Sequence, residues 1–277
     1  MTLNCKQQLV DLNSPKVMGI LNVTPDSFFD GGKYKDENTL LRQVEKMLND
    51  GATFIDIGAY SSRPGAEHVA ETEELRRILP IIDILLKKFP HILISIDTFR
   101  SIVAEHCLQQ GAALINDISA GVLDKNMFHV VAKHRSPYVM MHLKGTPQSM
   151  QGHTTYTNLL QDILFYFSER MAEARAAGIK DIIVDPGFGF AKSTDQNYEL
   201  LKQLNLFHEL DVPLLIGLSR KSMIYKVLET DAKGALNGTT ALHMYALGKG
   251  VNILRAHDVK EAMDCIRLWE VIPSEKD

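Results

Sequence analysis

Short apolar segments alternate with longer amphipathic segments along almost the whole chain. The short segments are rich in Ile, Val and Leu and contain few polar residues, which is typical of parallel strands buried on both faces. Eight of them are predicted to be strands: 17–23, 54–59, 92–98, 113–118, 138–142, 181–187, 213–219 and 251–257. Their spacing predicts a repeated strand-and-helix unit.

The segments between the strands have a helical period. Residues 39–52 place four apolar side chains on one helical face. Further helical patterns cover 73–89, 101–112 and 158–179. Several of these segments end in a glycine just before the next strand, which is a common helix C-cap. These glycines are Gly51, Gly111, Gly178 and Gly250.

The number and length of these units predict an α/β fold, a (β/α)8 TIM barrel, for which about 250 residues is typical. A doubly wound open sheet is the alternative. The first strand is not followed by a G-x-G-x-x-G sequence, which counts against that alternative. No linker of biased composition divides the chain, so we expect one domain over residues 1–277 with a short N-terminal extension over 1–15.

Composition narrows the ligand class and the compartment. The chain is 45% hydrophobic and 23% charged, and its Lys and Arg residues are scattered, so we expect small-molecule ligands and no nucleic acid. The cysteines Cys5, Cys107 and Cys265 show no C-x-x-C spacing, which favours a reducing compartment. The apolar runs are shorter than a membrane span and the N-terminus lacks a signal-peptide pattern, so we expect a cytoplasmic protein.

Polar residues stand at the C-terminal ends of the predicted strands. In a barrel these positions converge on one mouth, where active sites form. A single aspartate there can be a helix N-cap, but a carboxylate with apolar neighbours along its strand is costly unless it binds something. Asp97 and Asp185 fit that description, whereas Asp56 is equally well explained as a structural carboxylate. The full set is Asn22, Asp56, Asp97, Asn116, Asp117, His142, Asp185, Ser219, Arg220, Lys221, Arg255 and His257.

One part of this set suits a flat heterocycle. Asp185, Asn116 and Lys221 offer an acceptor, an amide and a cationic donor, which match an amidine-like edge beside a carbonyl. Arg255 adds a planar guanidinium that can stack on a ring. The glycines of DPGFGF (185–190) would let a ligand approach the backbone, and its phenylalanines would form an apolar wall. A plain tight turn is the alternative.

A second part suits an anion. Arg63 lies on the loop SSRPG, Arg255 and His257 follow the last strand, and SRKS (219–222) brings two cations to an expected helix start. Such groups at a barrel mouth commonly bind phosphate. Asn22 would complete the shell of a Mg²⁺ ion held mainly by diphosphate oxygens and water. The sequence contains no P-loop motif and no His/Cys cluster at zinc spacing.

Eight segments closely resemble the dihydropteroate synthase family: GILNVTPDSFFDGG, SSRPGAE, SIDTFR, INDISAG, MMHLKGTPQSMQ, DPGFGF, GLSRKSMI and RAHDV. They occur in order through nearly the whole chain. The resemblance implies a barrel transferase of folate synthesis that joins 4-aminobenzoate to 6-hydroxymethyl-7,8-dihydropterin diphosphate, releases diphosphate and is a target of sulfonamides. It also implies Mg²⁺ as cofactor and a homodimer, built through the last helices.

The resemblance further implies a role for each matching residue. The pterin would be bound by Asp97, Asn116, Met140, Asp185, Lys221 and Arg255. The diphosphate would be bound by Arg63, Arg255 and His257, and by Asn22 through Mg²⁺. The 4-aminobenzoate site would be formed by Pro25, Phe28, Ser62, Pro64, Phe190 and Ser222. The catalytic residues would be Asp97, Arg63, Lys221, Arg255 and His257. Ser62 and Ala191 depart from the family, which often has Thr and Gly there.

This resemblance leads to a mechanism and to two rivals. Because an aromatic amine is a weak nucleophile, we expect a dissociative, SN1-like substitution in which NVTPDSFFDGG (22–32) closes as a lid. A concerted displacement and a fixed loop whose phenylalanines only fill the core are the alternatives. A pterin-binding methyltransferase would not need Arg63, SRKS or His257. A catalytically silent pterin-binding protein would be expected to lack residues of the first two loops, which look intact here.

Overall fold

The computed structural model describes residues 1–23, 33–60 and 69–272, with the backbone alone for 33–36. Eight parallel strands form one sheet in the order β8-β7-β6-β5-β4-β3-β10-β9. A bridge between Val184 and Leu214 joins the two outer strands, so the sheet closes into a barrel. The predicted (β/α)8 barrel is confirmed. The strands are β3 (Lys16–Asn22), β4 (Phe54–Gly58), β5 (Leu93–Asp97), β6 (Leu114–Asp117), β7 (Tyr138–Met141), β8 (Ile182–Asp185), β9 (Leu215–Ile216) and β10 (Ile253–Ala256).

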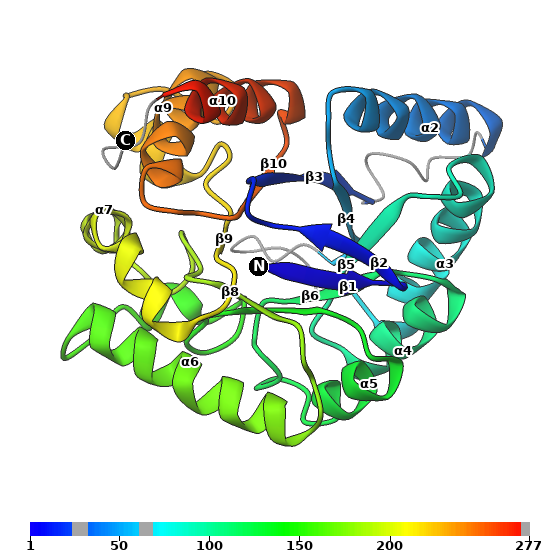
Figure 1. Cartoon of the computed structure of the whole chain (residues 1–277), viewed down its shortest axis with the longest axis horizontal. Helices are drawn as coiled ribbons and strands as arrows, with labels where there is room; N and C mark the ends of the chain where they lie inside the picture. Colours follow the sequence, from blue (N-terminus) through cyan, green and yellow to red (C-terminus); the bar gives the residue numbers. More distant parts are fainter. Residues whose placement is uncertain (24–32, 61–68, 273–277) are drawn as a thin grey trace.

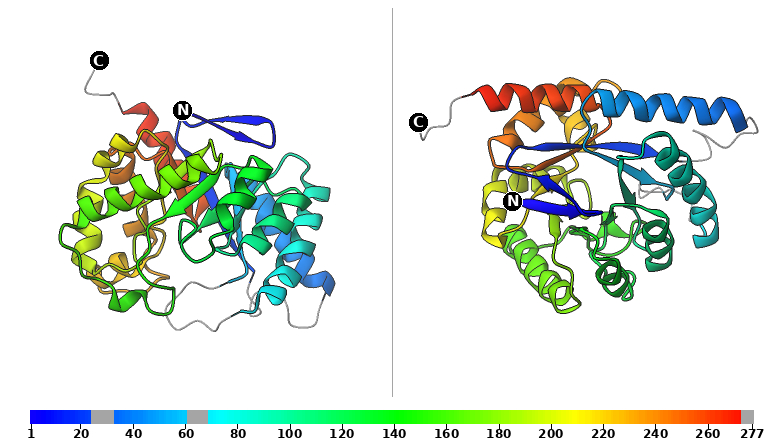
Figure 2. Two further views of the ribbon diagram at one scale, coloured as in Figure 1. Left: turned by 90° about the horizontal axis from the view of Figure 1, so that it is seen from below. Right: turned by 45° about the vertical axis from the view of Figure 1, so that its right-hand side comes forward.

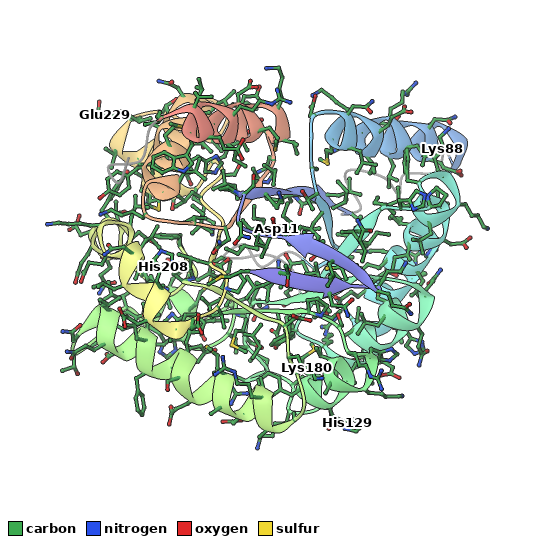
Figure 3. All side chains as sticks on the ribbon, in the orientation of Figure 1. Asp11, Lys88, His129, Lys180, His208 and Glu229 are labelled. Atoms are coloured by element: carbon green, nitrogen blue, oxygen red, sulfur yellow. The ribbon has the colours of Figure 1, made fainter. Side chains whose placement is uncertain are left out.

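The helices form an outer ring around the sheet (Figure 1). Charged side chains such as Lys88 and Glu229 lie at the outer edge of this ring (Figure 3). No helix within the described ranges is both long and apolar enough to cross a membrane. The helices are α2 (Lys33–Asn49), α3 (Glu71–Lys88), α4 (Ser101–Gln110), α5 (Met127–His134), α6 (Leu159–Ala176), α7 (Thr194–Lys202), α8 (Ser222–Val227), α9 (Leu236–Leu247) and α10 (Val259–Val271), with 3-10 turns η1 (Met150–Gly152) and η2 (Leu204–Leu210).

The strands are buried on both faces, and their side chains alternate between two surroundings. In β4, Ile55 and Ile57 belong to the core between sheet and helices, while Phe54 belongs to a second core inside the barrel. At the N-terminal ends of the strands the inner core contains apolar residues such as Met18, Leu93 and Ile253. At the C-terminal ends the inner positions become polar, as Asp56 and Asn116 illustrate. The strands therefore contribute apolar residues to the floor, and several of them contribute polar residues to the mouth.

An N-terminal hairpin covers the floor of the barrel. Strands β1 (Thr2–Cys5) and β2 (Gln8–Asp11) pair antiparallel around a two-residue turn with positive φ. The hairpin lies across one end of the barrel (Figures 1 and 2). Its inward side chains pack against the inner core; they are Leu3, Cys5, Val10 and Leu12. The sequence predicted an extension over 1–15 and missed this hairpin.

Candidate active site

The polar inner positions of the strands form one pocket at the mouth of the barrel. Residues that are far apart in the chain meet there because parallel strands bring their C-terminal ends to one rim. The pocket is lined by Asp97, Asn116, Ile118, Met141, Asp185, Phe190, Gly217, Lys221 and Arg255. Five of the six residues predicted to hold a heterocycle are among them. The sixth, Met140, is not.

Arg255 lies at the centre of the polar group. Its Nε donates to Asp56 Oδ2 at 2.6 Å, and its Nη2 donates to Asp97 Oδ2 at 2.8 Å. Asp56 also accepts from Ser95 Oγ at 2.5 Å and from Asn116 Nδ2 at 3.1 Å. Asp56 is fully buried, and these contacts supply the partners that a buried carboxylate requires. Asp56 therefore orients two pocket residues, Arg255 and Asn116.

Burial shifts the titration of both pocket carboxyls. Burial raises the pKa of Asp97 to about 7, although the charge of Arg255 opposes the shift. Burial also raises the pKa of Asp185, while Lys221 and the Gly187 N–H favour its charged form. The Oδ1 atom of Asp185 accepts that N–H at 2.8 Å. A ligand that supplies N–H donors would favour the charged form of both carboxyls.

Lys221 is held against the turn that follows β8. Its Nζ donates to the Phe188 carbonyl oxygen and lies 4.8 Å from the centre of the Phe190 ring. Burial lowers the pKa of Lys221 to about 8, and Asp185 opposes that shift. A cation with its stem along an aromatic ring suits a site that takes both a flat ring and a charged group.

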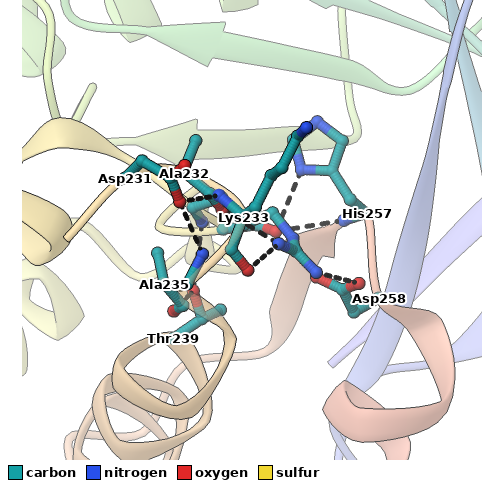
Figure 4. A network of polar contacts seen from close by, with 10 residues as sticks. Asp231, Ala232, Lys233, Ala235, Thr239, His257 and Asp258 are labelled. Atoms are coloured by element: carbon teal, nitrogen blue, oxygen red, sulfur yellow. Dashed lines mark hydrogen bonds and ion pairs between the residues drawn. The ribbon is translucent and has the colours of Figure 1, made fainter.

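The next loops bring His257 and Arg220 to the rim. His257 Nδ1 lies 3.0 Å from Ser219 Oγ, and the same hydroxyl accepts the His257 backbone N–H at 3.2 Å. Arg220 donates two hydrogen bonds to Asp258 and one each to the carbonyls of Ala232 and Lys233 (Figure 4). Arg220 thus ties the loops after β9 and β10 together, and its guanidinium is engaged in that contact rather than lining the pocket.

The structure distributes the remaining predicted residues as follows. Asn22 ends β3 at the same rim, with an exposed side chain, and Ser222 begins α8 directly after Lys221. Met140 lies in the core between sheet and helices, and its neighbour Met141 lines the pocket instead, because successive strand residues point to opposite faces. Five predicted residues lie outside the described part of the chain: Pro25, Phe28, Ser62, Arg63 and Pro64.

Ala191 shows how the chain accommodates a departure from the family pattern. Its φ is +49°, a conformation that favours glycine. Its methyl group is buried among Ile118, Met141 and Met150, and its carbonyl accepts a hydrogen bond from Tyr156. The packing of the methyl group offsets part of the backbone cost.

Sequence reasoning missed Ser95 and Met141 and left Asp56 open. Ser95 and Asp56 are polar residues within apolar strands, and each lies two positions from another residue that faces the barrel interior. This spacing indicates that both side chains also face the interior, where they contact each other. Met141 gives no such signal, since Met140 and Met141 are identical in type. Only the register of β7 against β8 separates them.

Comparison with known proteins assigns the class. Residues 18–257 match the family model of pterin-binding enzymes. The chain is 42% identical over 272 residues to dihydropteroate synthase of Haemophilus influenzae, with 98% of each chain covered. It is also similar to the Yersinia pestis dihydropteroate synthase solved with a sulfonamide drug (TM-score 0.91, 40% identity, 98% of each chain). A third similar protein is the Thermus thermophilus enzyme solved with 4-aminobenzoate (TM-score 0.88, 33% identity, 99% of this chain and 100% of that chain).

The chain belongs to the pterin-binding enzyme family. Within that family its relatives are dihydropteroate synthases, and the resemblance stated from the sequence is confirmed. The activity is that of a folate-synthesis transferase, as the sequence motifs predicted.

Proposed function

We propose that the mouth pocket binds the pterin ring of the diphosphate substrate through Asp97, Asn116, Asp185, Lys221 and Arg255. The observation that carries this proposal is their convergence on one pocket from separate strands and one helix start. A carboxylate accepts parallel N–H bonds from an amidine-like edge, and Asn116 and Lys221 supply donors for the ring nitrogen and carbonyl. Met141 replaces Met140 as the side chain that would pack against the ring.

The same pocket supports a dissociative substitution. The C–O bond to diphosphate would break with its electron pair on the leaving oxygen, and the nearby Asp97 carboxylate would stabilise the cation left on the methylene. The amine nitrogen would then form the C–N bond and lose its proton to solvent. Arg255, His257 and Arg63 would bind the departing diphosphate, although Arg63 lies outside the described residues. Concerted displacement is the alternative, and a secondary deuterium isotope effect near unity at that methylene would favour it.

A second pocket would hold 4-aminobenzoate beside the pterin. The similar Thermus thermophilus enzyme was solved with this compound, which supports the assignment. Phe190 offers an aromatic wall next to Lys221, and Ser222 brings a hydroxyl and the start of α8 toward the carboxylate. Pro25, Phe28, Ser62 and Pro64 would complete the pocket, and they lie outside the described residues. The similar Yersinia pestis enzyme, solved with a sulfonamide drug, supports inhibition by that class at the same pocket.

We infer that the protein supplies only part of the coordination shell of Mg²⁺ at this site. Within the described ranges, no three His, Cys, Asp or Glu side chains are grouped to hold a metal ion. Asn22 supplies one neutral oxygen at the rim, and diphosphate oxygens with water would supply the rest of the shell. When bound, Mg²⁺ would help to neutralise the charge of the leaving diphosphate.

We further propose that the protein is a homodimer and that it is located in the cytoplasm. The last helices carry large apolar residues on their exposed surface, which favours a homodimer through this region. The residues are Val227, Leu228, Tyr245, Leu268, Val271 and Ile272. The three cysteines are buried free thiols, which suits a reducing, cytoplasmic compartment.

Incubation of the protein with the pterin diphosphate, 4-aminobenzoate and Mg²⁺ tests the proposal. We expect diphosphate release that requires both organic substrates. A pterin-binding methyltransferase or a silent pterin-binding protein would bind the pterin and release no diphosphate. Chelation of Mg²⁺ should lower the rate, and a rate unaffected by chelation would contradict the proposed metal.

A further inference from the structure

Lys192 is a buried lysine directly before the N-cap residue of α7. The N-terminal end of a helix carries partial positive charge, which disfavours a cation there. A buried ammonium group is also costly unless its N–H groups are bonded. The position therefore requires a specific reason for a lysine.

The reason is a complete set of acceptors around Nζ. The ammonium has three N–H groups, and it finds the Gly187 carbonyl at 3.0 Å, the Phe190 carbonyl at 3.1 Å and His142 Nδ1 at 3.0 Å. The Phe190 backbone N–H also donates to the Gly187 carbonyl. Lys192 thus closes both ends of the turn 187–190. Burial lowers the pKa of Lys192 to about 7, and Asp185 opposes that shift.

His142 anchors this contact to the barrel. Burial, followed by the charges of Lys192 and Lys144, lowers the pKa of His142 well below its usual value, so the ring is neutral and Nδ1 can accept. The His142 backbone N–H donates to the Asp185 carbonyl at 3.0 Å, and its ring packs edge-on against Tyr166. The end of β7 therefore fixes the position of the Lys192 ammonium.

The closed turn carries both groups that contact Lys221. The Phe188 carbonyl accepts from Lys221 Nζ, and the Phe190 ring lies beside the same atom. Phe190 and Lys221 line the pocket, whereas Lys192 does not. We propose that Lys192, held by His142, is a positioning residue that sets the 187–190 turn and through it places Phe190 and Lys221 for substrate binding. This inference rests on the proposed roles of those two residues.

The variant Lys192→Met tests the inference, because Met keeps the length of the side chain and removes the donors. We expect the KM for 4-aminobenzoate to rise 10- to 100-fold, as for other residues that orient a direct ligand contact, with a smaller effect on kcat. Lys192→Arg keeps a cation with N–H donors and should recover part of this loss. Lys202→Met removes an exposed lysine at the end of α7 and should leave KM unchanged.

A double variant separates positioning from general stability. In a Phe190→Ala background, Lys192→Met should change the KM for 4-aminobenzoate by less than threefold, because the ring that it positions is gone. The inference is overturned if Lys192→Met lowers Tm but leaves the KM for 4-aminobenzoate within twofold. It is also overturned if the fold-increase in KM of the double variant is the product of the two single-variant increases. If Lys192→Met does not fold, His142→Leu, which removes one acceptor, must raise the same KM or the inference fails.

The two proposals can fail separately. If Phe190→Ala leaves the KM for 4-aminobenzoate unchanged, the proposed wall of that pocket is wrong. The affinity for the pterin diphosphate then remains as the measure, because Lys221 contacts the same turn through the Phe188 carbonyl and the Phe190 ring. A Lys192→Met variant with wild-type pterin affinity in that case would overturn the positioning role.

Discussion

Arg255 shares its guanidinium between two carboxylates, and this contact sets the charge of the whole pocket. Asp56 is fully buried and pairs with Nε, while Asp97 pairs with Nη2 and faces the ligand space. Because Asp56 already balances one charge, Asp97 can gain or lose a proton without leaving Arg255 unpaired. The remaining carboxyl, Asp185, is then the proposed acceptor for the N–H groups of the pterin.

Asp185→Asn removes a charged acceptor at nearly constant volume. Hydrogen bonds to a charged group contribute about 1.5–3 kcal/mol, so the Kd for the pterin diphosphate should rise roughly 10- to 150-fold. Calorimetric titration with the pterin substrate measures this. Asp195→Asn, an exposed change on α7, serves as the control. Unchanged affinity would exclude Asp185 from the site.

Asp97 predicts a pH dependence. Its pKa is about 7 because burial favours the neutral carboxyl, and only the charged form can stabilise a cation. The kcat/KM should therefore rise with pH up to about 7, with a tenfold loss for each unit below. The pH–rate profile of Asp97→Asn should lack this limb. A limb that persists in the variant would assign it to another group.

Polar residues inside apolar strands made much of this site predictable. Asp97 and Asp185 stood out because a carboxylate is costly among apolar neighbours. Met140 and Met141 could not be separated in the same way, since burial of either one is favourable and only sheet register decides which faces the pocket. His142 was among the polar residues expected at the strand ends, but its contact with Lys192 was missed, because hydrogen bonds from a lysine to turn carbonyls leave no trace in residue spacing.

At the scale of elements, strands such as β4 and β6 place apolar residues toward the floor and polar residues toward the mouth. The predicted strands begin and end within two or three residues of the observed ones, because runs of β-branched residues bounded by glycine and polar residues mark buried parallel strands. The hairpin β1–β2 was missed because each strand has four residues and the turn Lys6-Gln7 lacks the usual Asn-Gly signal.

Leu3→Ala tests the hairpin as a stabilising element. Leu3 is 1% exposed within the floor of the barrel, so the free energy of unfolding should fall by about 2–5 kcal/mol. Denaturant unfolding measures this, and kcat at 25 °C should stay unchanged because the mouth is at the opposite end. Leu9→Ala, at a position 70% exposed on the same hairpin, should change stability by less than about 0.5 kcal/mol. Equal effects would mean that the hairpin does not seal the floor.

The packing of α9 predicts an acid-sensitive stability. His243 is buried, and neither ring nitrogen has a hydrogen-bond partner among the described residues. Burial lowers its pKa to about 4 from 6.5, so the unfolded chain takes up a proton first as the pH falls. The free energy of unfolding is therefore unaffected by protonation of His243 above pH 6.5. It falls by up to about 3 kcal/mol as the pH falls from 6.5 to about 4. His243→Leu should reduce this pH dependence of unfolding, and the exposed His91→Leu should not.

At the scale of the whole molecule, the two ends of the barrel and its outer surface have separate tasks. The floor is closed by the hairpin, the mouth holds the polar pocket, and the exposed apolar residues of the last helices face outward. The barrel was predictable because the strand-and-helix repeat runs the length of the chain. The surface of α8–α10 was harder to interpret, since single exposed apolar residues are common on any protein.

Leu268→Glu tests the proposed dimer. Leu268 is 59% exposed on α10, and a charge there would be costly to bury between two copies of the chain. Sedimentation should show a dimer for the wild type and a monomer for the variant. Leu9→Glu introduces the same charge on the hairpin and should leave the dimer intact. A wild-type monomer, or a dimer that survives Leu268→Glu, would contradict an interface through α10.

The hairpin across the floor also determines how compounds reach the interior of the barrel. Because the hairpin closes the N-terminal end, substrates must enter and products must leave at the C-terminal rim. In the proposed arrangement of the two substrates, the compound bound deepest, between Asp97 and Asp185, cannot leave while another molecule occupies the space above it. In this arrangement, the molecule that binds last is the first that can leave.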